Sequence, residues 1–189
     1  MANSAPDTLK PYTTITDFVT GREVPNIGAE ENRQAVTQYL VTEKGYSKDD
    51  IGVDVKIELA IAGEPYRSQV DLVVKVNDGS LPIMAIKCAA GSLGSREREI
   101  VAAARLLENF QIPYAVVSDG KTALVLDTVS GKKTDAGMAA IPSKEAASRM
   151  LDAYKPIGLP ADRLEREKLI FRTYDSENVN VQGKLKPQL

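Results

Sequence analysis

Three consecutive stretches near the middle of the chain have the pattern of β-strands. Over residues 51–61, apolar and charged positions alternate, as in a strand with one buried face. A second strand is expected over residues 67–76, where Asp71 interrupts an otherwise apolar centre. A third is expected over residues 81–88, after an N-D-G-S stretch typical of a hairpin turn. The pattern therefore predicts a strand followed by a β-hairpin.

Four further segments repeat their apolar residues with the 3.6-residue period of a helix. The expected helices span residues 30–44, 95–110, 143–154 and 160–171, with Gly45, Ser95 and Ser143 as caps. Two more short strands are expected at residues 114–118 and 122–127, around a turn at Gly120. This order predicts an α/β fold in which helices flank a mixed central β-sheet.

The elements divide the chain into three predicted parts. Residues 1–28 are an N-terminal extension, expected to be extended and weakly structured because prolines and glycines interrupt it. Residues 29–155 hold the α/β domain. Residues 156–189 hold a charged C-terminal helix and a polar tail that is expected to be loose. That helix either packs on its own domain or binds a partner.

Composition narrows the classes of protein that fit. The 189 residues, 43% of them hydrophobic, suit one folded domain with tails. No apolar run is long enough for a transmembrane helix, and the polar N-terminus lacks the features of a secretion signal, so we expect a cytoplasmic protein without a membrane partner. The chain has no histidine, which excludes zinc sites with histidine ligands and histidine-based catalytic triads. With a net charge of −2, binding to nucleic acid would need a local basic patch.

Two charged residues lie on the strands of the predicted hairpin. A charge on an apolar strand is costly unless it is paired or functional, and both Asp71 and Lys87 are in this position. A turn near Gly79 brings the two residues to the same end of the sheet. Ala85 stands two residues before Lys87, so both side chains are expected on one face of the strand.

The order of five short motifs is similar to that of a known nuclease family. The motifs, which span residues 30–120 of a similarity that extends over about residues 30–127, are E-E-N-R-Q, K-G-Y-S-K-D-D-I, Y-R-S-Q-V-D-L-V-V, P-I-M-A-I-K-C-A-A and P-Y-A-V-V-S-D-G. Together they resemble the PD-(D/E)xK nuclease superfamily, and specifically the N-terminal nuclease domain of type I restriction enzyme R subunits. The resemblance implies a restriction-endonuclease-like core. In those R subunits an ATP-driven translocase follows the nuclease domain, and we expect the present chain to stand alone without one.

The resemblance also implies roles for particular residues. Asp71 matches the metal-binding aspartate of the family, and Lys87 matches its catalytic lysine. Glu30, or its neighbour Glu31, matches the acid that the first helix contributes. In an active site of this kind, Asp71 and Glu30 would bind Mg²⁺, the only cofactor indicated, and Lys87 would act on the attacking water and the phosphate.

The motif departs from the family at its central acid. Where the family has glutamate or aspartate, this chain has Ala85, and a methyl group cannot bind a metal ion. Glu97 and Glu99 on the following helix are candidate replacements, but we do not expect either to reach the site. The favoured interpretation of Asp71 and Lys87 is an ion pair that remains from an ancestral site, rather than a working one.

Two functions from different classes stay open. The first is a catalytically degenerate nuclease fold that acts as a binding or accessory subunit, with a protein partner or DNA. The second is a Mg²⁺-dependent DNA endonuclease with a rearranged metal site. A replacement carboxylate within reach of Asp71 and Lys87 would favour the second. A third interpretation, in which Ala85 was introduced to trap an active enzyme, finds no support in the surrounding residues. The sequence does not indicate an oligomeric state.

Two smaller features have plain interpretations. Cys88 follows the lysine, and we expect a small core residue there rather than a reactive thiol. Arg96, Arg98 and Arg105 would suit a phosphate backbone if they formed a basic stripe. Because glutamates are interspersed among them, a solvated helix face is the favoured prediction.

Overall fold

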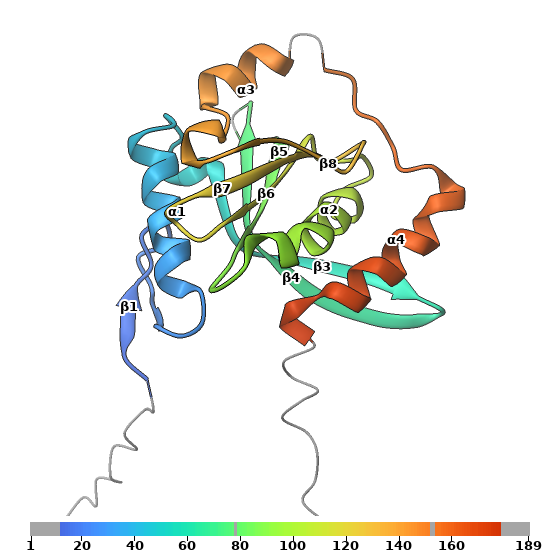
Figure 1. The fold of residues 1–189 in the computed structure, drawn as a ribbon, viewed down its shortest axis with the longest axis horizontal. Coiled ribbons are helices and arrows are strands. Elements are labelled where there is room, and N and C mark those ends of the chain that lie inside the picture. The colour runs from blue at the N-terminus through green and yellow to red at the C-terminus, as the bar shows by residue number, and fades with distance from the viewer. Residues whose placement is uncertain (1–11, 78, 152–153, 179–189) are drawn as a thin grey trace, which may run out of the picture.

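A mixed six-stranded sheet forms the centre of the protein. The computed structural model describes residues 12–77, 79–151 and 154–178 (Figure 1). Its sheet has the strand order β3-β4-β5-β6-β7-β8, in which β5 and β6 are parallel and all other neighbours are antiparallel. The strands are β3 Ile51–Ile61, β4 Glu64–Val76, β5 Leu81–Cys88, β6 Tyr114–Ser118, β7 Ala123–Asp127 and β8 Lys132–Ala136.

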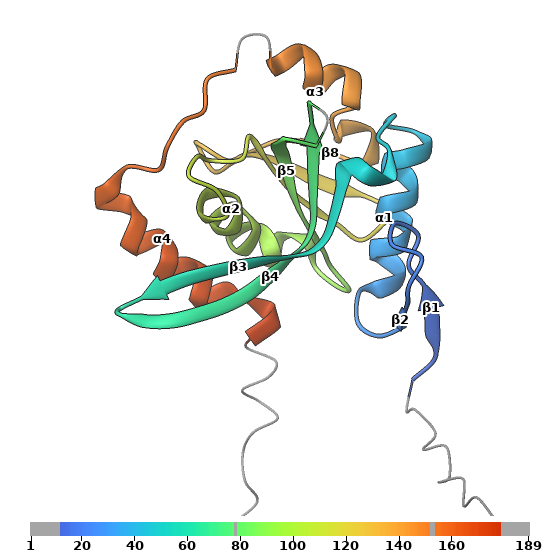
Figure 2. The ribbon, with the colours of Figure 1, turned by 180° about the vertical axis from the view of Figure 1, so that it is seen from behind.

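Helices cover both faces of this sheet (Figures 1 and 2). They are α1 Glu30–Thr42, α2 Glu97–Leu106, α3 Lys144–Leu151 and α4 Ala161–Tyr174, with short 3-10 turns η1 Lys48–Asp50, η2 Leu93–Arg96 and η3 Met138–Ala140. One core cluster joins the sheet to α1 and α3, and a second joins the opposite face to α2 and α4. The α/β fold with a helix-flanked mixed sheet is therefore confirmed, and it has the form of a restriction-endonuclease-like core.

The period of two along each strand decides which face a residue joins. Leu72 and Ile86, which are paired across β4 and β5, belong to the cluster with α1. Their sequence neighbours Val73 and Ala85, also paired, belong to the cluster with α2. Since the two clusters lie on opposite faces, Asp71 and Lys87 are directed to the face that α2 and α4 cover.

The helix after β5 is shorter than its apolar pattern predicts. The segment before it forms η2, and the hydroxyl of Ser95 donates to the carbonyl of Ser92 instead of capping the helix. The predicted cap at Ser143 is confirmed, because its Oγ accepts the N–H of Ala146 at 3.2 Å. The turn predicted at Gly120 is also confirmed, with that glycine at a φ of +81° between β6 and β7.

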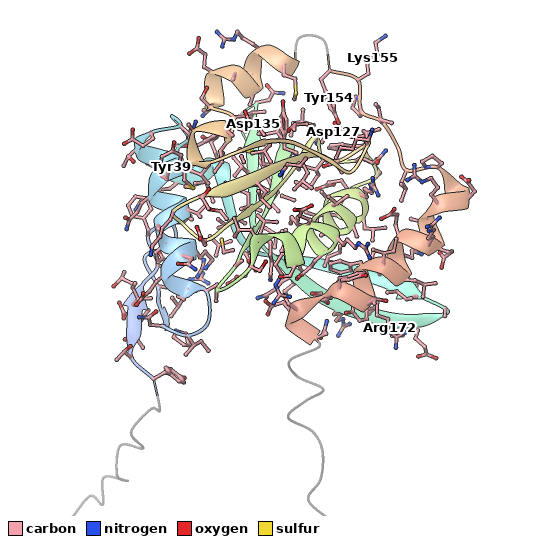
Figure 3. All side chains as sticks on the ribbon, viewed as in Figure 1. Tyr39, Asp127, Asp135, Tyr154, Lys155 and Arg172 are labelled. Atoms are coloured by element: carbon pink, nitrogen blue, oxygen red, sulfur yellow. The ribbon has the colours of Figure 1, made fainter. Side chains whose placement is uncertain are left out.

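Two features of the sheet region have no strong signal in the sequence. β8 consists of five exposed residues, K-K-T-D-A, and so lacks the alternation that marks a half-buried strand. Asp127 on β7 and Asp135 on β8 lie on this edge of the molecule (Figure 3). The extension expected to be weakly structured contains a second sheet, in which β1 Thr14–Thr16 pairs with β2 Glu23–Pro25. That expectation was wrong for residues 14–25.

The β1–β2 hairpin is held to the domain by buried polar contacts, together with the packing of Val19 against the core cluster. Asp17 in its turn is 1% exposed, and its carboxylate bonds to Gln34 at 3.0 Å and to Arg33 at 2.9 Å, both on α1. The hairpin has no local sequence signal because the partners of Asp17 lie on α1, which is a different element. The predicted loose tail over residues 179–189 lies outside the described residues, and the three-part division of the chain stays a prediction.

The C-terminal helix α4 packs on its own domain, which was one of the two alternatives predicted for it. Phe171 on α4 is 1% exposed and meets the ring of Tyr66 on β4 edge to face, with centroids 6.2 Å apart. On the same helix, Glu167 forms a buried ion pair of 2.7 Å with Arg105 on α2. Within the described ranges, no helix is long and apolar enough to cross a membrane.

Candidate functional site around Lys87

Asp71 and Lys87 are neighbours across the β4–β5 hairpin, as predicted. The Nζ of Lys87 donates to Oδ1 of Asp71 at 3.0 Å. The other carboxylate oxygen, Oδ2, accepts the backbone N–H of Cys88 at 2.6 Å. Both side chains are largely buried, so the contact is a charge-assisted hydrogen bond shielded from water. The predicted ion pair is therefore present.

Two further carboxylates surround the Lys87 ammonium. Glu177, which follows α4, lies with Oε1 3.1 Å from Nζ, and Glu99 on α2 lies with Oε1 3.5 Å from it. The ammonium donates hydrogen bonds to Asp71 and Glu177 and forms an ion pair with Glu99. Glu99 is 4% exposed. The expectation that it would not reach the site was wrong, because η2 shifts the start of α2 and turns Glu99 toward the sheet, whereas Glu97 lines a different cleft.

This cluster changes the proton affinity of its members. Burial by itself would lower the pKa of Lys87, but the carboxylates of Asp71, Glu99 and Glu177 outweigh burial and raise that pKa above its usual value. Burial raises the pKa of Asp71 and of Glu99, although Lys87 opposes the rise in each case. Lys87 is consequently a charged donor at neutral pH, not a neutral base.

A short segment after α4, residues 175–178, closes one side of the site. The N–H and the hydroxyl of Ser176 both donate to Oε1 of Glu99, at 3.1 and 2.7 Å. Tyr66 donates to Asp175 at 2.6 Å, and the amide of Asn178 donates to the carbonyl of Arg67 at 2.9 Å. We call residues 175–178 the closing segment, because it occupies groups of Glu99 and Lys87 that a ligand would otherwise meet.

Glu30 lies in the same pocket but belongs to a different ion pair. The pocket has a volume of about 590 Å³, and its lining includes Glu30, Asp71 and Lys87. The Glu30 carboxylate accepts hydrogen bonds from Arg33 at 2.7 Å and Gln34 at 2.6 Å. Among the residues described, no hydrogen bond or ion pair joins Glu30 to Asp71 or Lys87. Glu31, the other candidate, is exposed and accepts from Asn26 instead.

Sequence reasoning missed three charged residues of this pocket: Asp54, Arg33 and Glu177. Asp54 reads as an outward polar position of β3, yet it has a φ of +50°, a conformation in which aspartate is over-represented. Arg33 lies one helical turn after Glu30, a spacing that could have indicated their pairing. Glu177 lies beyond the last periodic segment, and we find no local signal for it.

The position of the missing motif acid is closed by apolar packing. Ala85 is fully buried, and its strand partners are Val73 on β4 and Ala115 on β6.

Cys88 is buried as well, and burial raises the pKa of its thiol well above the ordinary value, as suits the predicted core residue.

The acidic side chains that the structure describes in the pocket do not form a binding site for the magnesium ion that the nuclease resemblance implies. Over residues 12–77, 79–151 and 154–178, no group of three histidine, cysteine, aspartate or glutamate side chains is placed to hold a metal ion. Each of the two predicted ligands, Asp71 and Glu30, already binds a cationic side chain. In this arrangement the residues do not fit Mg²⁺, and the assignment of Asp71 and Glu30 as ligands stays a prediction.

Comparison with known proteins identifies the family of the domain. The family described as type I restriction enzyme R protein N terminus matches residues 28–142, which is more than half of the chain and includes α1, the hairpin and α2. No match was found among curated proteins, and none among solved structures. On the family match, the chain belongs to the type I restriction enzyme R protein N-terminal family.

Proposed function

We propose that this chain is a catalytically degenerate member of the PD-(D/E)xK nuclease fold that acts as a binding or accessory subunit. The observation that carries the proposal is the state of Lys87. Its ammonium lies within 3.5 Å of three carboxylates, and the motif position two residues before it is a buried alanine. A nuclease site of this class needs carboxylates free to bind a metal and a cation free to stabilise the phosphate.

The charge arrangement supports a structural role for the retained residues. With Asp71, Glu99 and Glu177 around it, the Lys87 ammonium balances carboxylates that would otherwise be available to a metal ion. It links β4, β5, α2 and the closing segment. An incoming phosphodiester would meet a pocket whose lining includes four acids, Glu30, Asp54, Asp71 and Glu177, against Lys87 and Arg33.

Metal binding and DNA cleavage, measured on the same sample, test the proposal. Titration with Mg²⁺ and with Mn²⁺ in a calorimeter is expected to give no specific binding, and supercoiled plasmid is expected to stay intact. The control variants are Lys87→Ala and Lys87→Arg, the second of which keeps the positive charge, and circular dichroism checks that each variant is folded. Micromolar to low-millimolar metal binding, together with cleavage that Lys87→Ala abolishes, would contradict degeneracy.

A Mg²⁺-dependent DNA endonuclease with a rearranged site is the second candidate, because one observation favours it. Glu99 supplies a carboxylate 3.5 Å from Lys87, as a replacement for the acid missing at Ala85 would have to do. Under this alternative, Glu99→Gln and Asp71→Asn abolish cleavage, whereas Glu97→Gln, a change on the same helix outside the pocket, leaves it intact. Cleavage that survives Glu99→Gln would exclude this role for Glu99.

A further inference from the structure

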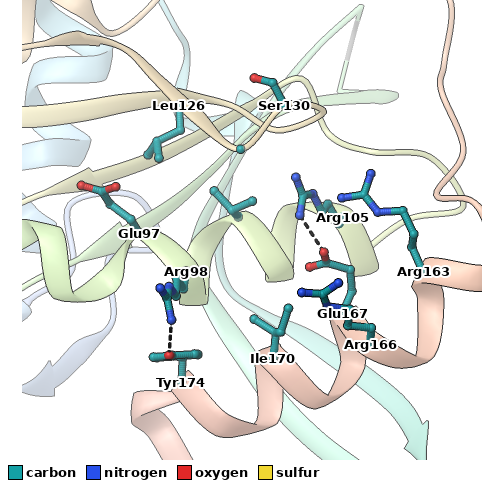
Figure 4. A pocket seen from close by; sticks show the side chains of 12 residues that line it. Glu97, Arg98, Arg105, Leu126, Ser130, Arg163, Arg166, Glu167, Ile170 and Tyr174 are labelled. Atoms are coloured by element: carbon teal, nitrogen blue, oxygen red, sulfur yellow. Dashed lines mark hydrogen bonds and ion pairs between the residues drawn. The ribbon is translucent and has the colours of Figure 1, made fainter.

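A second cleft, distinct from the Lys87 pocket, lies between α2 and α4 (Figure 4). It has a volume of about 660 Å³, within the range of roughly 300–1,000 Å³ typical of small-molecule sites. The turn between β7 and β8, at Ser130 and Gly131, closes one side of it. The two pockets share no lining residue, so a ligand could bind in this cleft whether or not the Lys87 site is degenerate.

One arginine of this cleft is part of its wall. Arg105 is buried, and its guanidinium is held by the carbonyls of Thr128 and Val129 at 2.9 and 3.1 Å and by Glu167 at 2.7 Å. The prediction of a solvated helix face was therefore wrong for Arg105. Gly131 packs directly against it, since a side chain there would meet the guanidinium at 3.1 Å. Arg105 thus fixes the distance between α2, α4 and the turn.

Three other arginines are exposed and face into the cleft. Arg163 and Arg166 are three residues apart on α4, so their like charges lie on one side of the helix. Among residues that the structure describes, neither side chain makes a hydrogen bond or an ion pair. Arg98 on α2 donates a hydrogen bond to the hydroxyl of Tyr174, and its guanidinium carbon lies 5.3 Å from the centroid of that ring.

The cleft is consequently a local region of positive charge in an acidic protein. Its lining contains four arginines and two glutamates, a formal charge of +2, whereas the whole chain has a net charge of −2. One of those glutamates, Glu167, is already neutralised by Arg105. Guanidinium groups match phosphate oxygens in pairs and remain charged at all relevant pH values, so they are well suited to bind an organic phosphate.

Apart from Ser130 and Gly131, the remaining lining is apolar. Ile170 on α4 and the ring of Tyr174 at one end are partly exposed, whereas Val101 on α2 and Leu126 on β7 lie buried behind them. Inorganic phosphate alone would leave this surface uncovered. A ligand with a phosphate at the arginines and a flat ring over the apolar residues would cover both parts of the cleft.

The geometry points to a binding site for a small phosphorylated ligand of the nucleoside phosphate class in the α2–α4 cleft. Arg163 and Arg166 contact the phosphate, Arg98 adds to the positive charge, and the partly exposed side chains of Ile170 and Tyr174 hold the base. Arg105 and Glu167 position the walls and do not contact the ligand.

Calorimetric titration of the full chain with adenosine monophosphate, adenosine and inorganic phosphate tests the site. We expect the nucleotide to bind most tightly, inorganic phosphate more weakly and adenosine not measurably. The double variant Arg163→Gln/Arg166→Gln is expected to weaken nucleotide binding by at least about tenfold per lost charge-assisted contact. Arg172→Gln is the matched control, because Arg172 is an exposed arginine of the same helix outside the cleft (Figure 3).

Several outcomes would overturn the assignment. They are no nucleotide binding up to about 10 mM, equal weakening by the double variant and by Arg172→Gln, and equal affinity for adenosine and adenosine monophosphate. A short DNA duplex that binds through Arg163 and Arg166 when the nucleotide does not would instead make the cleft a nucleic-acid surface, and would also overturn it. Since the substituted arginines are exposed, circular dichroism is expected to show all variants folded.

Discussion

The two pockets that meet at the C-terminal end of α4 have opposite charge. Tyr174 lines the α2–α4 cleft, and Ser176, two residues later, lines the pocket around Lys87. The cleft has four arginines against two glutamates, whereas the Lys87 pocket has four acids against one lysine and one arginine. A single chain with nearly balanced charge therefore separates its charges into two neighbouring sites of +2 and −2.

The two sites also differ in whether their positively charged side chains are already paired with acids of the protein. Lys87 is 6% exposed and its ammonium is surrounded by carboxylates, while Arg163 and Arg166 are exposed. A buried charge must be paired within the protein because water cannot solvate it, but an exposed charge stays available to a ligand. In this domain the charged residues that resemble a nuclease motif are therefore already paired within the protein. The positive charge that remains available to a ligand lies in the α2–α4 cleft.

Replacing Lys87 is expected to have the largest effect. Lys87→Met leaves Asp71 and Glu99 buried without their cation, so we expect the free energy of unfolding to fall by about 3–5 kcal/mol. Urea unfolding followed by circular dichroism measures it. The control is Lys168→Met on α4, whose partner Glu165 is exposed, with an expected loss of at most about 1 kcal/mol. Similar losses of unfolding free energy in both variants would mean that Asp71 and Glu99 do not depend on Lys87 as their buried counter-charge.

Restoring the motif acid is expected to destabilise the protein. Ala85→Glu forces a larger, ionisable side chain between Val73 and Ala115, and we expect a loss of about 1–3 kcal/mol from overpacking, increased by the cost of burying the carboxyl group. Ala85→Gln, which is similar in size but uncharged, separates the cost of overpacking from the cost of burying the carboxyl group in the same unfolding assay. Specific Mg²⁺ binding by a stable Ala85→Glu variant would show instead that the site lacks only this acid.

A smaller effect is expected in the pH dependence of stability. Burial raises the pKa of Glu99 in the folded protein above its ordinary value of 4.5, so the folded state keeps this proton to a higher pH than the unfolded state. The resulting stabilisation is present below pH 4.5 and is lost as pH rises through the folded-state pKa. The unfolding free energy of wild type minus that of Glu99→Gln should therefore decrease across this window.

Unfolding curves at half-unit steps between pH 4 and pH 7 would measure that difference. Glu145→Gln, an exposed change on α3, controls for the loss of one negative charge. A difference that increases with pH for Glu99→Gln would contradict the sign, and it would mean that the attraction of Lys87 for Glu99 outweighs burial.

The smallest effect on stability is expected in the arginine cleft. Arg163→Gln removes one of two neighbouring like charges and no contact within the described protein, so the unfolding free energy should change by no more than about 0.5 kcal/mol. Thermal unfolding of this variant beside Arg172→Gln measures it. A loss above about 1 kcal/mol would assign Arg163 to the fold rather than to a ligand.

Much of the fold could be predicted because its signals are local. The alternation over residues 51–61 and the turn residues before Leu81 define β3 and β5 with the observed bounds. Less of the site could be predicted. The hairpin brings Asp71 to Lys87, but the hydrogen bond from Lys87 to Glu177 joins residues 90 positions apart. No periodicity connects such residues, since their approach depends on how α4 packs on α2.

Residue types and local patterns were enough to predict the α/β order and the pairing of Asp71 with Lys87, and they show that histidine and an acid at position 85 are absent. These follow from residue identity, from the period of two and from a short turn. Packing between distant segments explains why Glu99 and Glu177 lie next to Lys87, why Arg105 is buried in the wall of the cleft, and why other arginines line the cleft. Burial and packing between distant segments determine which charges are neutralised, and neither is encoded in a local pattern.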